Sequence, residues 1–252
     1  MSGPALSGPQ PSDALLAEAL LGERIDDALV ARVGARLEAV RERIANAGGE
    51  VGAIRIVAVT KGFGLAAIRV ARALGLDAIG ENYADELVAK AERLARLGEA
   101  RGCSWHFLGA IQQNKVARLA PYVARYEGVD RLVEGRRIAR EAPGARVLVE
   151  VDFSQAPGRG GVAPEAAAGL VGQLRELELC VEGLMTVAPL GEAAEAARAF
   201  GGLSELADGL ELAERSMGMS DDFELAVRAG ATTLRLGTVL FGPRLPPPKV
   251  PK

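Results

Sequence analysis

The sequence predicts a single α/β domain of the (β/α)8 class, a TIM barrel. Short apolar runs rich in β-branched residues alternate with segments of helical periodicity through most of the 252-residue chain. Strands that alternate with helices form a parallel sheet with right-handed crossovers, and eight such strands can close into a barrel. A doubly wound open sheet is the alternative, but no G-x-G-x-x-G sequence follows the first apolar run to support it.

The expected elements follow one another in a regular order. Apolar residues recur at steps of three and four over residues 25–44, which predicts an extra N-terminal helix that ends at the Gly48-Gly49 pair. The strands are then expected at residues 54–59, 78–80, 105–109, 123–126, 146–151, 179–184, 215–217 and 233–236. A helix is expected after each strand except the last, at residues 65–74, 83–97, 113–119, 131–141, 164–174, 192–212 and 221–229.

Composition restricts the class of protein. The formal net charge of −3 gives no electrostatic reason to expect nucleic acid or an anionic membrane as a partner. Two cysteines and one histidine predict neither a disulfide framework nor a metal site, and we expect both cysteines to be buried, in a reducing compartment. No apolar run is long enough to cross a bilayer and no signal peptide is evident, so a cytoplasmic protein is expected.

The two ends of the chain differ from the rest in composition. Residues 1–12 are rich in Gly, Pro and Ser and are expected to form a disordered leader. The proline-rich residues 245–252 are expected to form a flexible tail. The barrel domain is therefore expected to cover residues 13–244.

Lys61 is the first candidate for a functional residue. In an α/β barrel the functional site lies at the C-terminal ends of the strands, and Lys61 directly follows the first expected strand. Enclosure and nearby cations lower the pKa of a lysine, which makes its amine a nucleophile toward aldehydes. The alternative is a strand-end lysine that pairs with a carboxylate such as Glu81, and position alone does not separate the two.

The ends of the last two expected strands, together with the loops that follow them, predict an anion site. Ser216, Gly218 and Ser220, followed by Gly237 and Thr238, offer hydroxyl groups and closely approachable backbone N–H groups. Barrels commonly bind a phosphate at these loops. The alternative is a well-capped turn without a ligand, because Ser220 before two aspartates is also a strong helix N-cap sequence.

A lysine after the first strand and a phosphate site across the barrel mouth together fit a phosphorylated aldehyde. Pyridoxal 5′-phosphate is such a compound, and its aldehyde would reach Lys61 while its phosphate would reach the last two loops. Arg235 of the eighth strand could then face the pyridine nitrogen and keep it unprotonated, which would make the ring a weaker electron sink.

These candidate residues belong to sequence strings that resemble one known family. The strings are A-V-T-K at 58–61, G-E-N-Y at 80–83, W-H-F-L-G at 105–109, Q-N-K at 113–115, S-M-G-M-S-D-D at 216–222 and R-L-G-T at 235–238. In this order they resemble the pyridoxal phosphate homeostasis protein family, also described as alanine racemase N-terminal domain-like. The resemblance extends from about residue 25 to residue 244.

The resemblance implies a fold-type III barrel that holds pyridoxal 5′-phosphate as a Schiff base on Lys61. It further implies a pocket whose other binding residues are Asn82, Met185, Ser216, Arg235, Gly237 and Thr238. In this arrangement the serine, the glycine and the threonine hold the phosphate, and the arginine faces the ring nitrogen.

The family binds, buffers and hands on the cofactor in vitamin B6 homeostasis without robust catalysis, so PLP-dependent apo-enzymes are the partners that the resemblance implies. An amino-acid racemase on the same barrel is the rival reading. A barrel that forms a transient imine with another sugar or aldehyde phosphate, as in aldolases, is a further alternative. Racemisation needs bases on both faces of the substrate carbon, and the racemases take one of them from a second, β-rich domain for which we expect no room here. An open barrel mouth is compatible with a monomer.

Three further residues have roles that the sequence leaves open. His106 on the third expected strand is expected to be bonded beneath the site, and a proton carrier near the cofactor is the alternative. Lys115 is expected to be a solvated helix residue, although it could be a second lysine that receives the cofactor. Arg159, in the loop at 156–161, stands about where the family often has a lysine, which puts a role of that loop in cofactor transfer in question.

Overall fold

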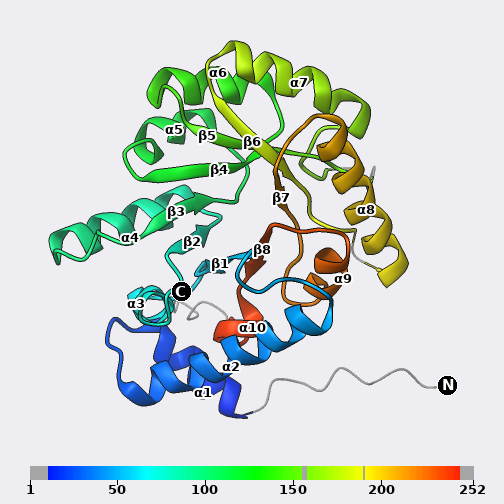
Figure 1. Ribbon diagram of the computed structural model, residues 1–252. Helices are drawn as coiled ribbons and strands as arrows, with labels where there is room; N and C mark the ends of the chain where they lie inside the picture. The colour runs from blue at the N-terminus through cyan, green and yellow to red at the C-terminus, as the bar shows by residue number, and fades with distance from the viewer. Residues whose placement is uncertain (1–10, 155–157, 190, 245–252) are drawn as a thin grey trace.

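The computed structural model describes residues 11–154, 158–189 and 191–244. Its centre is a closed barrel of eight parallel strands, in which each strand pairs with its neighbours in sequence and β8 pairs with β1 (Figure 1). The strands are β1 (Arg55–Val59), β2 (Ala78–Glu81), β3 (Ser104–Phe107), β4 (Val123–Val129), β5 (Arg146–Glu150), β6 (Cys180–Met185), β7 (Glu214–Ser216) and β8 (Thr233–Leu236). The predicted (β/α)8 class is therefore confirmed.

Helices surround this barrel, and most of them were predicted. They are α1 (Pro11–Leu21), α2 (Asp27–Asn46), α3 (Leu65–Ala73), α4 (Ala84–Arg96), α5 (Gln113–Leu119), α6 (Leu132–Glu141), α7 (Pro164–Glu176), α8 (Ala193–Gly209), α9 (Phe223–Arg228) and α10 (Thr238–Phe241). Helix α1 was not predicted, and it begins at Pro11, inside the stretch expected to be a leader. The rest of that stretch and the expected tail at 245–252 lie outside the described residues.

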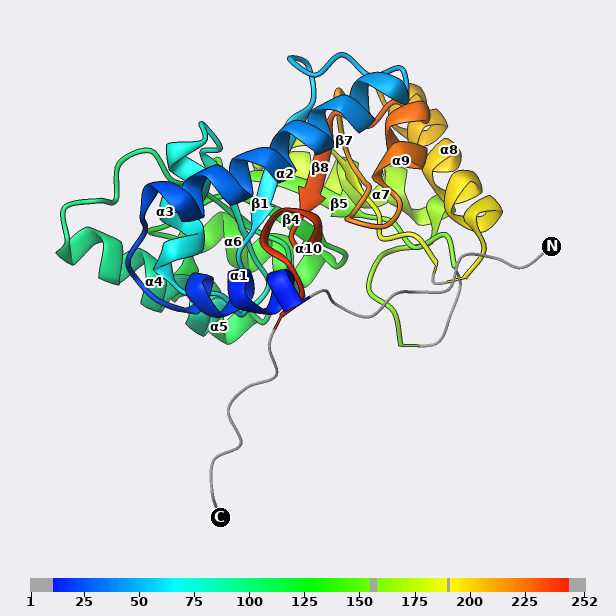
Figure 2. The same cartoon turned by 90° about the horizontal axis from the view of Figure 1, so that it is seen from below.

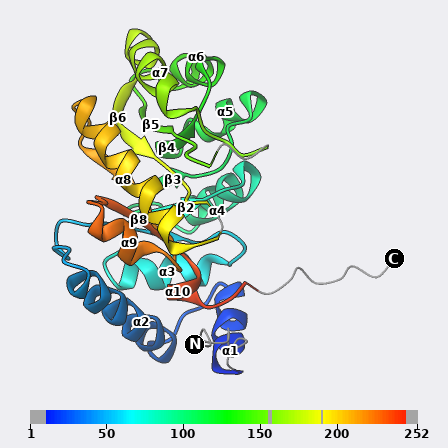
Figure 3. The ribbon, with the colours of Figure 1, turned by 90° about the vertical axis from the view of Figure 1, so that its right-hand side faces the viewer.

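Helix α2 occupies the position in the helical ring that follows β8. Only the four-residue helix α10 follows β8 directly in the described chain, and α2 lies along the outside of the barrel next to α3, α9 and α10 (Figure 2). Arg43 of α2 binds Glu224 of α9 (Nε–Oε1 2.6 Å), and its guanidinium lies 4.3 Å from the centre of the Phe223 ring. The extra N-terminal helix therefore completes the ring. Seen from the side, α1 and α2 lie at the end of the molecule away from α5, α6 and α7 (Figure 3).

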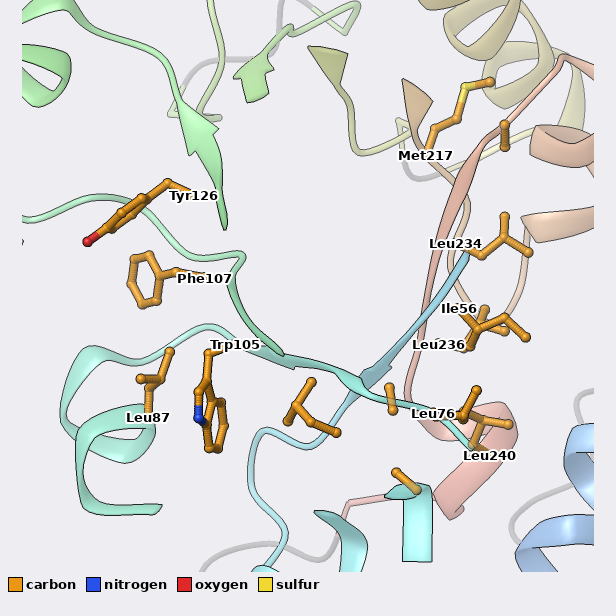
Figure 4. Close-up of a cluster of buried hydrophobic side chains, with 14 of the residues drawn as sticks. Ile56, Leu76, Leu87, Trp105, Phe107, Tyr126, Met217, Leu234, Leu236 and Leu240 are labelled. Carbon is orange, nitrogen blue, oxygen red and sulfur yellow. The ribbon is translucent and has the colours of Figure 1, made fainter. Parts of the chain in front are cut away.

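Side chains alternate between two environments along the strands. In β8, Leu234 and Leu236 join the buried cluster between the barrel and the helices, so Thr233 and Arg235 face the barrel interior. Figure 4 shows part of the outer cluster, where aromatic side chains of β3 and β4 lie beside Leu87 of α4. The same alternation puts three more polar side chains inside the barrel: His106, Arg125 and Glu127. The barrel interior is therefore unusually polar for a packed core.

Two expectations are wrong, one about the length of a strand and one about the burial of the cysteines. Strand β4 continues to Val129 instead of ending at Tyr126, because Glu127 and Gly128 interrupt the apolar pattern although both are buried. The cysteines are not buried: Cys180 is exposed and Cys103 is partly buried. Within the described residues, no helix has the length and apolar character needed to span a bilayer.

Candidate functional site

A cavity of about 360 Å³ opens at the C-terminal ends of the strands, and this volume is typical of small-molecule sites. Its lining residues are Val59, Lys61, Phe63, Asn82, Leu108, Met185, Val187, Met219, Ser220, Asp221, Arg235, Gly237, Thr238 and Arg244. Six of the seven predicted binding residues are among them, and Ser216 is the exception. Another cavity, of about 320 Å³, lies at the N-terminal ends of the strands beside Arg55, Asp77 and Glu214, and no lysine lines it.

Lys61 reaches this cavity from the loop that follows β1. Its ammonium group forms no hydrogen bond and no ion pair with any described residue. Burial lowers the pKa of Lys61, and the guanidinium groups of Arg244 and Arg235 lower it further, while Glu81 acts in the opposite direction. The ion pair between Lys61 and Glu81, which the sequence left open, is not formed. An unpaired amine with a lowered pKa is suited to attack an aldehyde.

A second lysine, Lys90 of α4, forms the ion pair with Glu81 that Lys61 does not form. Its Nζ donates to Glu81 Oε1 (2.6 Å), to Glu86 Oε1 (2.7 Å) and to the carbonyl oxygen of Thr60 (2.8 Å). The Thr60 hydroxyl also donates to Glu81 Oε1 (2.7 Å). Burial raises the pKa of Glu81, although the charge of Lys90 opposes the rise. Lys90 is therefore fully engaged in holding the residue that precedes Lys61.

The residue that follows Lys61 is held by the same helix. The backbone N–H of Gly62 donates to Glu86 Oε1 (2.7 Å). Gly62 adopts a φ of +76°, and a Cβ atom there would lie 3.3 Å from Cδ of Arg244. A residue with a side chain would be strained at this turn, so glycine fits both the backbone and the close approach of Arg244.

Arg235 lines the cavity from β8 and is 5% exposed. Its Nη1 donates to Ser216 Oγ (2.8 Å) and its Nη2 donates to the carbonyl oxygen of Thr186 (2.8 Å). Burial lowers the pKa of Arg235, and the charge of Glu127 opposes this effect. Both acceptors are neutral, so no direct ion pair with a described carboxylate cancels the positive charge of Arg235.

A chain of buried polar side chains supports Arg235 from inside the barrel. His106 Nδ1 lies 2.5 Å from Glu127 Oε1, and Ser216 Oγ donates to Glu127 Oε2 (2.6 Å). Burial alone would raise the pKa of Glu127, but bonding to His106 and Ser216 and the charges of His106 and Arg235 hold that pKa below its ordinary value. His106 is 1% exposed and lies where a structural role was expected.

Ser216 was predicted to hold the phosphate, but it is not among the residues that line the cavity. Its hydroxyl is bonded to both Arg235 and Glu127, and its side chain is completely buried. Ser216 is the last residue of β7, so it belongs to the inner wall of the barrel and not to the loop above it. It therefore orients Arg235 and does not line the predicted phosphate site.

The loops after β7 and β8 form the part of the cavity that contains Gly237 and Thr238. Ser220 Oγ accepts a hydrogen bond from the N–H of Val239 (3.1 Å), which joins the two loops. Gly218 has a φ of +90°, and a Cβ atom there would lie 2.6 Å from Cβ of Ala226. The N-cap residue of α9 is Asp222, so Ser220 is not the cap that its sequence context suggested.

Arg244 is a lining residue that the sequence did not single out. It lies just past the unpredicted helix α10, and its guanidinium is one of the charges that lower the pKa of Lys61. No direct sequence signal marks it, because an arginine after a short apolar segment is ordinary. With Lys61 and Arg235 it gives the cavity three cationic side chains.

Lys115 and Arg159 lie outside this cavity. Lys115 pairs with Asp85 (Nζ–Oδ2 2.9 Å) and borders a separate cavity of about 150 Å³. Arg159 Nη2 donates to the carbonyl oxygens of Val187 (2.9 Å) and Ala188 (3.1 Å), so it fastens its loop to the segment after β6. Residues 155–157, which precede it, lie outside the described residues.

Glu150, at the end of β5, is a titratable residue that the sequence did not identify. Burial and the neighbouring charge of Asp130 raise its pKa to about 7, against an opposing effect of Arg235. Asp130 itself accepts a hydrogen bond from the N–H of Gly161 (2.9 Å). The C-terminal end of the barrel therefore carries a carboxyl group that changes charge near neutral pH.

Comparison with known proteins identifies the family of the chain. The alanine racemase N-terminal domain family matches residues 35–245. The chain is 38% identical to the pyridoxal phosphate homeostasis protein of Pseudomonas aeruginosa over 85% of this chain and 94% of that one. It is 37% identical to the protein of the same name from Deinococcus radiodurans, over 83% and 99%.

A solved structure gives the same result in three dimensions. PipY of Synechococcus elongatus, solved with PLP bound, superposes with a TM-score of 0.71 and 33% identity over 83% of this chain and all of that one. The overall fold of this chain is therefore shared with a chain of recognisable sequence similarity. The chain belongs to the pyridoxal phosphate homeostasis protein family, within the alanine racemase N-terminal domain family.

Proposed function

We propose that the chain binds pyridoxal 5′-phosphate through Lys61 and acts as a carrier of this cofactor in vitamin B6 homeostasis. The observation that carries the proposal is a single cavity that brings together the unpaired amine of Lys61, the guanidinium of Arg235 and the Gly237-Thr238 turn. The names of the relatives and the PLP bound to PipY support the same function. The proposed recipients are PLP-dependent apo-enzymes, and the proposed carrier is a monomer.

The lining residues fit the chemical parts of this cofactor. Lys61 would hold the aldehyde carbon and Arg235 would face the ring nitrogen. The phosphate would lie at Gly237 and Thr238, and the positive charges of Lys61, Arg235 and Arg244 favour an anion in this cavity. When bound, pyridoxal 5′-phosphate supplies an aldehyde that condenses with a primary amine and a ring that can accept electron density.

The position of Arg235, and not a lack of possible bases, supports a carrier over a racemase. A racemase needs a base on each face of the substrate carbon. Among the described lining residues, Lys61 and Asp221 carry the side chains that could serve as two such bases. Asp221 is therefore the second base that a racemase at this site would need. An arginine beside the ring nitrogen also leaves the ring a weak electron sink.

A transfer experiment tests the proposed function. Protein is loaded with pyridoxal 5′-phosphate, freed of excess by gel filtration and mixed with an apo-aminotransferase, whose recovered activity is followed. We expect the loaded protein to restore activity, and we expect Lys61→Ala to lose the cofactor on the column. Failure of the loaded wild-type protein to restore any activity would contradict the carrier role.

The racemase alternative is tested with the same loaded protein. It is incubated with L-alanine or D-alanine, and the enantiomers are separated by chiral chromatography. We expect no turnover approaching about 1 s⁻¹, a rate at the lower end of ordinary enzymes. Turnover at or above that rate, lost in Asp221→Asn, would replace the carrier with a racemase.

A further inference from the structure

Helix α4 holds the two peptide groups on either side of Lys61. On one side, Lys90 Nζ donates to the carbonyl oxygen of Thr60 (2.8 Å). On the other side, Glu86 Oε1 accepts from the N–H of Gly62 (2.7 Å). Lys90 and Glu86 also bind each other at 2.7 Å, one helical turn apart. Through Lys90 and Glu86, these bonds connect the residue before Lys61 to the residue after it.

This set of bonds is built into the barrel wall. The side chain of Lys90 is 10% exposed, and its second carboxylate partner, Glu81 at the end of β2, is completely buried. Leaving such a carboxylate without its lysine costs free energy, which favours the state in which this ion pair is intact. The Lys61 side chain, by contrast, has no polar partner of its own among the described residues. Its direction therefore depends on the backbone from which it projects.

We infer that Lys90 and Glu86 are positioning residues for Lys61, which fix the peptide groups before and after it and so aim its amine into the cavity. This inference rests on the proposed function, because its main test uses the reaction of Lys61 with an aldehyde. Correct placement of reacting groups matters because an error of about 1 Å can slow a reaction by about 100-fold.

Glu86 is the better residue to change, because its side chain is 24% exposed and its loss threatens the fold less than loss of Lys90. Glu86→Ala removes the acceptor for Gly62. Glu86→Gln keeps a carbonyl oxygen that can accept from both Gly62 and Lys90 but removes the negative charge. Asp85→Ala is the matched control, because Asp85 is an acid on the same turn that pairs with Lys115 and Arg118 and not with the residues beside Lys61.

The main measurement is the rate at which Lys61 acquires a borohydride-stable pyridoxyl label from pyridoxal 5′-phosphate. We expect Glu86→Ala to slow the labelling by about 10- to 100-fold, with Glu86→Gln restoring most of the rate and Asp85→Ala remaining close to wild type. Pyridoxine 5′-phosphate has the same ring and phosphate but no aldehyde. We expect its affinity to change by less than about twofold in all three variants, since its binding does not need an aimed amine.

Three outcomes would overturn the inference. The first is wild-type labelling in Glu86→Ala. The second is a Glu86→Gln variant as slow as Glu86→Ala, which would make the charge of Glu86 and not its hydrogen bonds responsible. The third is an equal loss of pyridoxine 5′-phosphate affinity in Glu86→Ala, which would indicate a collapsed cavity.

A cofactor-free measurement separates this inference from the proposed function. Amide hydrogen exchange at Gly62 reports the bond to Glu86 directly. We expect faster exchange in Glu86→Ala than in wild type and Glu86→Gln, and equal exchange in all three would overturn the inference. If wild-type protein takes no label on Lys61, the proposed function fails, and the exchange experiment still decides whether α4 holds this turn.

Discussion

The two ends of the barrel interior each contain a buried arginine, and the two arginines have different kinds of partner. At the N-terminal end, Arg125 of β4 forms ion pairs with Glu182 (Nη2–Oε2 2.8 Å) and with Glu214 (Nη1–Oε2 3.0 Å). At the C-terminal end, Arg235 of β8 donates to a hydroxyl group and to a carbonyl oxygen. Lys61, beside it, has no polar partner among the described residues.

This difference separates a structural charge from a functional one. A buried cation that is paired with carboxylates has its charge cancelled within the fold, and removing one partner is costly. A buried cation held by neutral oxygen atoms keeps its field available to a ligand. The N-terminal end of the barrel is therefore built for stability, and the C-terminal end keeps positive charge available for a phosphate-bearing ligand.

The largest expected effect concerns the paired arginine. Arg125→Ala should lower the free energy of unfolding by about 3–5 kcal/mol, because Glu182 and Glu214 lose the cation that they share. Urea denaturation measures this loss. Arg118→Ala is the control, since its ion pair is exposed and water screens it, and it should have little effect. Equal small losses in both variants would remove the distinction between the two ends.

A smaller effect is expected from Glu150, which has no ion-pair partner among the described residues at the C-terminal end. Its pKa is raised from an ordinary 4.5 to about 7, so the folded state holds its proton more tightly than the unfolded state does. Relative to Glu150→Gln, the stabilisation of the wild type should therefore be fully present below pH 4.5 and should be lost as the pH rises from there through about 7, by about 3 kcal/mol in all.

Urea denaturation of both proteins at several pH values between 4 and 8 measures this dependence. A difference in unfolding free energy between wild type and Glu150→Gln that stays constant over this range would show that Glu150 titrates normally. A difference that grows in favour of wild type with rising pH would reverse the expected sign.

The smallest expected effect concerns the influence of the Arg244 charge on the pKa of Lys61. Burial is the main cause of its lowered pKa and Arg244 is the next, so Arg244→Gln should raise that pKa without restoring it fully. The pH at which pyridoxyl labelling of Lys61 reaches half its maximal rate should shift upward. A shift to lower pH, or none, would show that Arg244 does not act on this amine.

The barrel and the rim of its site were predictable because they depend on local signals. Alternating apolar runs and helical segments define the eight strands, and residues such as Lys61, Gly237 and Thr238 stand directly after strand ends. Arg235 was predictable from the alternation of β8. Helix α1 was not, because its leucines occur in adjacent pairs, which blurs helical periodicity, and because its packing against α3 is a tertiary effect.

The interior of the site was not predictable, because it depends on which strand residues meet across the barrel. Glu127 and His106 come together from neighbouring strands whose register shifts by a bulge between Trp105 and His106. Ser216 was assigned to the phosphate as a hydroxyl at the end of the seventh strand and by the family resemblance, yet its hydroxyl is bonded to Arg235 and Glu127 inside the barrel. Sequence spacing alone does not distinguish the rim of a barrel from its wall.

The proposed role of Lys61 is tested most directly by identifying the lysine that takes up pyridoxal 5′-phosphate. Wild-type protein is incubated with the compound, reduced with borohydride, digested and mapped by mass spectrometry. We expect a pyridoxyl label on Lys61, with Lys90 and Lys115 unlabelled because both amines are engaged by carboxylates. Absence of a label on Lys61, or a label on Lys90 or Lys115 in its place, would contradict the proposed role.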